Sequence, residues 1–367
     1  MRKLLVTGAA GFIGSNFVHY WHANNPEDLI VALDALTYAG YSHNLTALMG
    51  KDQFKFVKGN IGDLALVESL LAKHDIDTLV HFAAESHVDR SISGPDAFIQ
   101  TNILGTHTLL KAAKKHWIDG PGNGLFHHVS TDEVYGSLNA SENAFIEITQ
   151  YAPNSPYAAS KAASDHLVRA YHKTYGLNVT TSNCSNNYGP FQFPEKLIPL
   201  CLLNILNGNP LPIYGDGKQT RDWLYVEDHC RAIESIIDKG ERGETYNIGG
   251  NSELANIDVV NALCKTINQK FADTPEMRKY YPNSPCSNGQ PAESLITYVN
   301  DRLGHDRRYA VDASKIAEEL GFLPTESFIS GLNKTVDWYV ENAEWWQPIL
   351  DGSYKNKNKN LMPRHFA

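Results

Sequence analysis

A glycine-rich turn near the start of the chain restricts the fold more than any other feature. Gly8, Gly11 and Gly14 have the spacing G-x-x-G-x-x-G, between an apolar run at 3–7 and a helical pattern at 15–23. Glycine permits the tight turn, and the N–H groups at the start of a helix can bind a pyrophosphate. The turn therefore predicts a dinucleotide-binding unit. The alternative is a turn that caps the helix and binds no ligand.

The first half of the chain alternates between strand and helix patterns. This alternation predicts an α/β fold with a Rossmann-type, doubly wound parallel sheet. After about residue 186, prolines interrupt the pattern, which indicates a smaller, mixed α/β substrate domain. Further strands are expected at 29–33, 54–57, 78–82, 125–129 and 179–184, and helices at 64–73, 98–116, 157–175 and 195–206.

The predicted division has two domains. Residues 1–185 and 222–250 would form the dinucleotide-binding domain, and residues 186–221 and 251–350 the substrate-binding domain. The polar segment 273–290 is expected to be a surface insertion. The low-complexity end of the chain, 351–367, is expected to be a flexible tail.

Charge and cysteine content narrow the class of protein. A formal net charge of −9 argues against a nucleic-acid partner. The five cysteines form no CxxC pair and no metal-ligand spacing, which is typical of a reducing cytosol. The chain has no apolar run of the roughly 20 residues that cross a membrane. We therefore expect a cytoplasmic protein without a metal, a membrane or a nucleic-acid partner.

Asp34 bears on the choice of cofactor. It ends the predicted second strand, about 20 residues after the glycine turn, where a carboxylate binds the ribose diol and repels a 2′-phosphate. NAD is therefore favoured over NADP. Asn60, Ile61, Gly62 and Asp63 follow the third strand and could hold the adenine, although Asp63 could equally cap the helix that starts at Leu64.

Tyr157 and Lys161 form a candidate catalytic pair. Their i, i+4 spacing places them on one face of the predicted helix at 157–175. An ammonium beside a phenol lowers the pKa of the phenol from about 10. The phenolate can then take a proton from an alcohol while hydride leaves the same carbon. The spacing is common by chance, but a preceding dinucleotide site favours catalysis.

Thr131, Asp132 and Glu133 follow the predicted strand at 125–129. Ligands bind at this end of the strands in open α/β sheets. Adjacent carboxyl groups repel each other, so their pKa values can separate into those of a general acid and a general base. The alternative is that Thr131 and Asp132 cap a turn while Glu133 is solvated.

Together these residues resemble the extended short-chain dehydrogenase/reductase family, and within it the dTDP-glucose 4,6-dehydratases. The adjacent acids Asp132 and Glu133 are more specific for that group than the glycine turn, which many relatives share. Further matching motifs cover nearly the whole chain and lie at 34–40, 83–91, 130–136, 183–190, 193–199, 216–223 and 301–310.

The resemblance implies a division of chemical roles. Tyr157 would take the proton of the sugar 4-hydroxyl, helped by Lys161 and Thr131, as hydride passes from C4 to NAD. Glu133 would then remove the C5 proton while Asp132 protonates the departing 6-hydroxyl. Hydride would return to C6, giving dTDP-4-keto-6-deoxyglucose. Asp132 is thus expected to hold a proton at rest, and Glu133 to be ionised.

The resemblance also implies two sets of binding residues. Ala9, Asn60 and Leu303 depart from the family pattern of Gly, Asp and Pro. Residues expected at NAD, besides Gly8, Gly11, Gly14, Asp34, Tyr157 and Lys161, are Phe12, Ile13, Ala35, Leu36, Thr37, Asn60, Ile61, Ala83, Ala84, Glu85, Ser86, His87, Thr101 and Asn187. Residues expected at dTDP-glucose are His87, Thr131, Asn186, Lys196, Leu197, Pro212, Ile213, Tyr214, Arg221, Asn256, Asp301, Arg302, Leu303, Gly304 and His305.

Other functions are left open by the sequence. One is a 4,6-dehydratase or 4-epimerase that acts on another nucleotide sugar, and the adjacent acids argue against the epimerase. A less favoured one is an NAD-binding sensor without catalysis, although such proteins commonly lack the tyrosine or the lysine. Family members are usually homodimers, and the helices at 98–116 and near Tyr157 are the expected interface.

Overall fold

The computed structural model describes residues 1–302, 304–355 and 358. The predicted substrate contact at Leu303 and much of the predicted tail, 356–357 and 359–367, lie outside the described residues.

The larger part of the molecule is built on a seven-stranded sheet. Its strands run in the order β10-β6-β5-β4-β1-β2-β3, and every neighbouring pair is parallel. The order changes direction between β1 and β4, which creates the topological switch point where such folds bind dinucleotides. The predicted Rossmann-type sheet is thus confirmed. Its strands are β1 (Lys3–Thr7), β2 (Leu29–Asp34), β3 (Phe54–Lys58), β4 (Thr78–His81), β5 (Leu125–Thr131), β6 (Val179–Cys184) and β10 (Thr245–Ile248).

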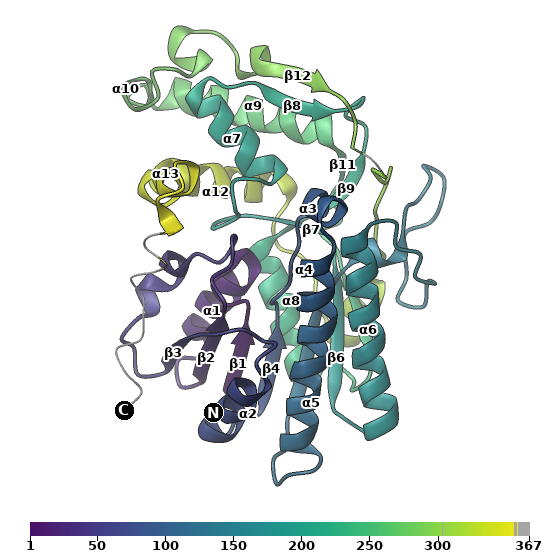
Figure 1. The fold of residues 1–367 in the computed structure, drawn as a ribbon. Coiled ribbons are helices and arrows are strands. Elements are labelled where there is room, and N and C mark those ends of the chain that lie inside the picture. Colours follow the sequence, from purple (N-terminus) through teal and green to yellow (C-terminus); the bar gives the residue numbers. More distant parts are fainter. Residues whose placement is uncertain (303, 356–357, 359–367) are drawn as a thin grey trace.

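Helices cover both faces of this sheet (Figure 1). Successive side chains of a strand point to opposite faces, so Leu4 and Val6 of β1 join one core and Leu5 joins the other. The first core includes α1 (Phe12–Asn24), α8 (Val226–Lys239) and α11 (Ser314–Leu320). The second includes α2 (Leu64–His74), α5 (Thr106–Trp117) and α6 (Pro156–Tyr175).

The predicted helix at 98–116 is not one regular helix. A short α4 (Asp96–Phe98) leads into a π-helical segment, η2 (Ile99–Gly105), before α5 begins. A π-helical turn inserts extra backbone and often marks a functional site. Hydrophobic periodicity does not distinguish this turn from an α-helix, which is why the sequence did not predict it.

The smaller part of the molecule lies beyond the carboxyl ends of the large sheet, at the top of Figure 1. Its own apolar core includes Leu202, Leu263 and Leu332. Its strands are β7 (Asn186–Tyr188), β9 (Thr220–Tyr225) and β11 (Glu253–Ala255) in one sheet, and β8 (Leu211–Tyr214) and β12 (Ile296–Val299) in another. Its helices are α7 (Leu197–Asn207), α9 (Asn256–Asp273), α10 (Met277–Tyr280), α12 (Phe328–Glu341) and α13 (Ala343–Leu350).

Several predicted boundaries differ from the observed ones. Helix α1 begins at Phe12, inside the glycine turn, rather than at residue 15. Helix α7 begins at Leu197 rather than residue 195. Ile316 packs in the core of the large sheet, although the predicted division gives this residue to the smaller domain.

Two segments predicted to lie at the surface are partly packed. Met277 and Tyr281, within 273–290, are buried in the core of the smaller part. In the C-terminal segment, Tyr354 and Asn358 are buried, and the amide of Asn358 bonds to the Gly40 carbonyl. Composition suggested exposure, but a few apolar or amide side chains suffice to dock such a segment. Among the described residues, no helix is both long and apolar enough to cross a membrane.

Candidate active site

The glycine turn leaves room for a ligand backbone at the end of β1. Gly8 has φ +67°, and a Cβ there would lie 2.6 Å from the Ala83 nitrogen. A Cβ on Gly14 would lie 2.2 Å from the Gly8 carbonyl oxygen. Both positions therefore require glycine. The free N–H groups at the start of α1 fit a pyrophosphate, so the residues present fit a dinucleotide.

Asp34 ends β2 beside this turn. Its carboxylate accepts hydrogen bonds from the N–H groups of Ala10, at 2.9 Å, and Leu36, at 2.7 Å. Burial raises the pKa of Asp34, and these two hydrogen bonds oppose the rise. The bonds hold the carboxylate at the cavity wall, where it can accept further bonds from a ribose diol. Leu36 has φ +53° and does not line the cavity.

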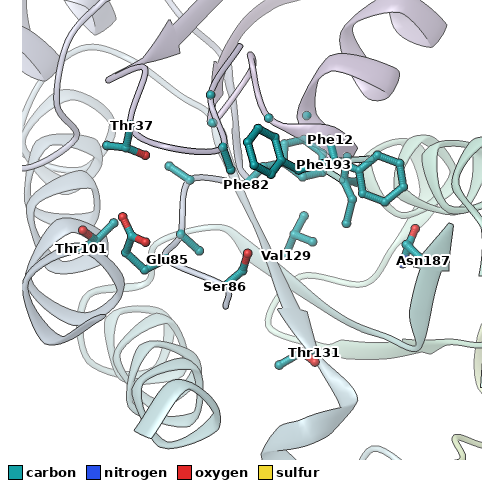
Figure 2. A pocket seen from close by; sticks show the side chains of 18 of the residues that line it. Phe12, Thr37, Phe82, Glu85, Ser86, Thr101, Val129, Thr131, Asn187 and Phe193 are labelled. Carbon is teal, nitrogen blue, oxygen red and sulfur yellow. The ribbon is translucent and has the colours of Figure 1, made fainter. Parts of the chain in front are cut away.

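One continuous cavity runs from the glycine turn to the carboxyl ends of β5 and β6 (Figure 2). It brings together the five predicted catalytic residues and most of the predicted NAD contacts. Leu36 and His87 are the two predicted NAD contacts outside its lining. The predicted NAD contacts that line it are Gly8, Gly11, Phe12, Ile13, Gly14, Asp34, Ala35, Thr37, Asn60, Ile61, Ala83, Ala84, Glu85, Ser86, Thr101, Tyr157, Lys161 and Asn187.

The π-helical segment η2 fixes the loop after β4. Asn102 accepts a hydrogen bond from the Glu85 N–H at 2.9 Å and donates one to the Glu85 carbonyl at 3.0 Å. It also donates to the Ser160 hydroxyl on α6 at 2.8 Å. Figure 2 shows Glu85 and Thr101 on one side of the cavity, opposite Asn187. Asn102 thus holds a cofactor loop against the helix that carries Tyr157.

Asn60 and Asp63 have local structural roles. Asp63 caps α2 by accepting a hydrogen bond from the Leu66 N–H at 3.1 Å, as one of its two predicted roles requires. Asn60 accepts a bond from the Gly62 N–H at 2.8 Å, and its side chain also lines the cavity.

Tyr157 and Lys161 lie in the first turns of α6. Ser155 caps this helix by accepting a bond from the Ala158 N–H at 3.0 Å, and Pro156 occupies its first turn. Lys161 is buried, and its ammonium donates a hydrogen bond to the Val129 carbonyl at 2.8 Å. The cap and this bond place both side chains at the carboxyl end of β5.

The electrostatics of Tyr157 differ from the prediction. Burial, and then the charge of Glu133, raise the pKa of Tyr157 well above its usual value. The Thr131 side chain acts in the opposite direction. Lys161 is not among the main groups that shift this pKa, and the hydrogen bond that its ammonium donates goes to the Val129 carbonyl. In this arrangement Tyr157 is a protonated phenol.

Asp132 and Glu133 begin a 3-10 turn, η3 (Asp132–Tyr135), directly after β5. The Thr131 hydroxyl donates to Oδ1 of Asp132 at 3.3 Å, and its oxygen accepts the Glu133 N–H at 3.3 Å. Thr131 therefore does cap a turn, but all three side chains also line the cavity. The capping role and the site role are compatible.

The two carboxyl groups have different surroundings. Burial, and then the charge of Glu133, raise the pKa of Asp132 well above its usual value. Burial also raises the pKa of Glu133, but the charges of Arg221 and Lys196 oppose that rise. Asp132 is thus the more strongly protonated of the pair, whereas cations favour the charged form of Glu133.

Only some of the residues predicted to contact the nucleotide sugar lie at the cavity. Asn186 and Lys196 line the cavity, and the charge of Arg221 reaches Asp132 and Glu133. Arg302 forms an ion pair with Asp89 at 2.5 Å, so its guanidinium is already engaged. The remaining predicted contacts lie outside the cavity lining and are His87, Leu197, Pro212, Ile213, Tyr214, Asn256, Asp301, Gly304 and His305.

Arg221 and Tyr214 occupy different environments. Arg221 is buried, donates to the carbonyls of Thr220 and Asp306, and lies over the Tyr309 ring at 4.1 Å. Tyr214 is partly exposed, with the Arg302 guanidinium 5.5 Å from its ring centre. Its ring is therefore accessible for stacking on a base.

The cavity also contains residues that the sequence did not single out. Seven of them lie inside the matching motifs at 34–40, 130–136, 183–190 and 193–199, and the other five precede a predicted residue or motif by one position, which was the available signal. Phe193 and Phe82 present aromatic surface, and both are labelled in Figure 2. The full set is Leu33, Ala39, Gly40, Gly59, Phe82, Val129, Ser130, Cys184, Ser185, Gln192, Phe193 and Glu195.

Comparison with known proteins accords with this geometry. The sequence profile of the family described as GDP-mannose 4,6 dehydratase matches residues 5–335. The chain belongs to this family. A dTDP-glucose 4,6-dehydratase from Xanthomonas campestris pv. campestris is 56% identical over 359 residues, which cover 97% of this chain and 98% of the relative.

Solved structures of the family have the same fold. A dTDP-glucose 4,6-dehydratase from Streptomyces venezuelae, with NAD and dTDP bound, has 46% identity and a TM-score of 0.84, covering 95% of this chain and 99% of that one. A UDP-glucose 4-epimerase from Thermotoga maritima, with UDP-glucose, has 26% identity and a TM-score of 0.78, covering 93% and 99%. Proteins named for both of the reactions that the sequence left open thus share this fold.

Proposed function

We propose that this chain is an NAD-dependent dTDP-glucose 4,6-dehydratase that forms dTDP-4-keto-6-deoxyglucose in deoxysugar biosynthesis. The observation that carries this function is the position of Asp132 and Glu133 in the same cavity as Tyr157 and Lys161. Oxidation of an alcohol needs the tyrosine and the lysine. Elimination of water needs an additional acid and an additional base.

Tyr157 and Lys161 serve the oxidation. NAD, when bound, supplies the hydride acceptor for C4 and later the hydride for C6. Tyr157 takes the proton of the sugar 4-hydroxyl, and Thr131 positions that hydroxyl. Tyr157 can accept this proton only as a phenolate, which burial disfavours. We assign to the cation of Lys161, four residues further along the same helix, the role of favouring that phenolate when substrate is bound.

Asp132 and Glu133 serve the elimination. A carbonyl at C4 acidifies the C5 proton, which Glu133 removes as the general base. Asp132, which burial keeps protonated, gives its proton to the 6-hydroxyl as that group leaves as water. The two roles need opposite protonation states. The charges of Arg221 and Lys196 favour the ionised form of Glu133, whereas burial and the charge of Glu133 favour the protonated form of Asp132.

The nucleotide sugar is bound from the smaller part of the molecule. Asn186 and Lys196 approach the sugar from the cavity, and Arg221 supplies positive charge for a diphosphate. Tyr214 stacks on the base. We propose an NAD-binding domain of 1–185 and 222–250 and a substrate domain of 186–221 and 251–350, except that α11 belongs with the NAD-binding domain because Ile316 packs against the large sheet.

Two further properties belong to the proposal. The enzyme acts in the cytoplasm, in keeping with its five free cysteines. It forms a homodimer through the helices at 98–116 and 157–175. Exposed apolar side chains on this surface, Ile99 and Leu104 in η2 and Tyr175 at the end of α6, support that interface.

Product analysis tests the proposed activity. The purified protein with NAD is mixed separately with dTDP-glucose and UDP-glucose, and products are followed by mass and absorbance. We expect a keto product lighter by one water, formed faster from dTDP-glucose. Interconversion of UDP-glucose and UDP-galactose without any dehydrated product would instead identify a 4-epimerase. Faster dehydration of UDP-glucose would support the proposed reaction but contradict dTDP-glucose as the preferred substrate.

A further inference from the structure

A buried carboxylate on α6 has no role in the proposed mechanism. Asp165 lies four residues after Lys161, so the series Tyr157, Lys161, Asp165 follows one face of the helix at intervals of four. Asp165 is buried and is not part of the cavity lining. It therefore lies behind the catalytic lysine rather than beside the substrate.

Asp165 connects α6 to β5. Its Oδ2 accepts hydrogen bonds from the Ser130 hydroxyl at 2.9 Å and the Tyr151 hydroxyl at 3.0 Å. Its Oδ1 lies 3.0 Å from Nε2 of His128. Ser130 and His128 lie on the same face of the strand that ends in Thr131. The carboxylate thus joins the strand of the acid–base residues to the helix of Tyr157 and Lys161.

Asp165 is also the main counter-charge of Lys161. Burial lowers the pKa of Lys161, and the charge of Asp165 gives the largest opposing effect. The hydrogen bond from Lys161 to the Val129 carbonyl supplies no negative charge. Conversely, the charge of Lys161 is the largest effect that opposes the rise of the Asp165 pKa, which reaches about 6.

Other titratable groups surround this pair. His81 from β4 and His128 from β5 have pKa values lowered by burial, so both are neutral near pH 7. Cys184 from β6 has a pKa raised to about 12 and is a neutral thiol. Tyr151, in the loop before α6, is protonated because burial raises its pKa. His166, next to Asp165 on α6, adds a weaker effect that lowers the pKa of Asp165.

We propose that Asp165 is a positioning residue that keeps Lys161 cationic and holds α6 against the end of β5 while Tyr157 takes the substrate proton. The inference rests on the proposed function, because it concerns the proton transfer of that same reaction. Asp165 acts through Lys161 and touches neither the substrate nor the cofactor. It therefore differs from the five catalytic residues.

The first test is Asp165→Asn in the NAD-bound enzyme. Loss of the carboxylate charge lowers the pKa of Lys161, so the lysine loses its proton at a lower pH. We expect reduction of bound NAD by dTDP-glucose, followed by absorbance after rapid mixing, to be within about threefold of wild type at pH 6.5. At pH 9 it should be at least about tenfold slower, since one unit of pKa corresponds to a tenfold change. Asp165→Glu should restore much of the rate at pH 9.

Tyr151→Phe provides a matched variant that keeps the carboxylate. The Tyr151 hydrogen bond lowers the pKa of Asp165, so its removal raises that pKa above about 6. At pH 9 Asp165 stays ionised, and at pH 6.5 Lys161 stays protonated even beside a neutral Asp165, so we expect rates within about threefold of wild type at both pH values. If Asp165→Asn does not fold, a rate of Tyr151→Phe at pH 9 at least about tenfold below wild type would still overturn the inference, because this variant keeps the charge.

A measurement without catalysis completes the test. In NAD-free protein, the ¹³Cε resonance of Lys161, identified by its loss in Lys161→Arg, should titrate at a lower pH in Asp165→Asn than in wild type. An equal titration, or rate losses that do not depend on pH in both variants, would overturn the inference. No reduction of NAD by wild type would instead contradict the proposed function.

Discussion

Lys161 on α6 donates a 2.8 Å hydrogen bond to the carbonyl oxygen of Val129 on β5. Val129 lies two residues before Thr131, so this bond joins the helix of the tyrosine–lysine pair directly to the strand that ends in the two acids. The alcohol base and the elimination pair therefore share one rigid support.

Asp132→Asn should slow the reaction without lowering the melting temperature. Asp132 has a raised pKa in the folded protein, so its charged form destabilises the fold as pH rises above the unfolded value of about 3.9. Asparagine carries no such charge, so the melting temperature should equal or exceed that of wild type, and more clearly at higher pH. Water loss should slow on the order of 10²-fold, because an amide cannot supply the proton.

Melting curves between pH 5 and 9 and single-turnover product analysis check this prediction. Reduction of bound NAD should be retained, because Asp132 does not act in the oxidation. An unchanged rate of water loss would remove Asp132 from the role of general acid.

Gly8→Ala should both destabilise the fold and weaken NAD binding. The new methyl group would lie 2.6 Å from the Ala83 backbone, at φ +67°. Gly176→Ala is the matched control, since Gly176 caps α6 at φ +71° with nothing within 4 Å. Both variants should lose about 1 kcal/mol from the unfavourable φ. Gly8→Ala should lose about 1–3 kcal/mol more, because the Ala83 backbone must shift to accommodate the methyl group. NAD affinity, measured by fluorescence titration, should fall at least about tenfold only for Gly8→Ala. Equal affinities would show that the turn does not bind the cofactor.

Asn358→Ala should loosen the loop beside the cofactor cavity. Oδ1 of Asn358 accepts bonds from the N–H of Ser42, at 3.1 Å, and its hydroxyl, at 2.9 Å, and the amide donates to the Gly40 carbonyl at 2.8 Å. Loss of these buried bonds should cost about 1–3 kcal/mol of unfolding free energy. Gly40 lines the cavity, so NAD should also dissociate faster.

Urea unfolding and NAD retention on gel filtration measure both effects. The exposed Asn24→Ala serves as the control, because Asn24 bonds within α1 to the Tyr20 carbonyl. Equal urea midpoints for the two variants would mean that the contact of Asn358 with Gly40 contributes nothing to stability.

Local motifs allowed much of the fold and site to be predicted. The glycine turn, Asp34 and the Tyr157–Lys161 pair each depend on residues close in sequence, and their spacing reflects helix and strand geometry. The parallel sheet followed from the alternation of strand and helix patterns. These features come together in one cavity because the carboxyl ends of parallel strands share one edge of the sheet.

Contacts between distant segments could not be predicted in this way. Arg302 pairs with Asp89 across 213 positions, and Asn358 reaches Gly40 across 318. Helix and strand periodicity in the sequence does not predict contacts between residues so far apart. The pKa of Tyr157 was also mispredicted, because the i, i+4 spacing does not show that Lys161 bonds to the Val129 carbonyl.

Glu133→Gln gives the most direct test of the central claim, that the surplus acid and base make this oxidoreductase fold a dehydratase. Glutamine cannot take the C5 proton, so rapid mixing with dTDP-glucose should give a persistent absorbance of bound NADH and no loss of water. Tyr157→Phe, as the control, should give neither signal, because it lacks the base for the 4-hydroxyl. Dehydrated product at the wild-type rate from Glu133→Gln, or equal loss of both steps, would contradict the account.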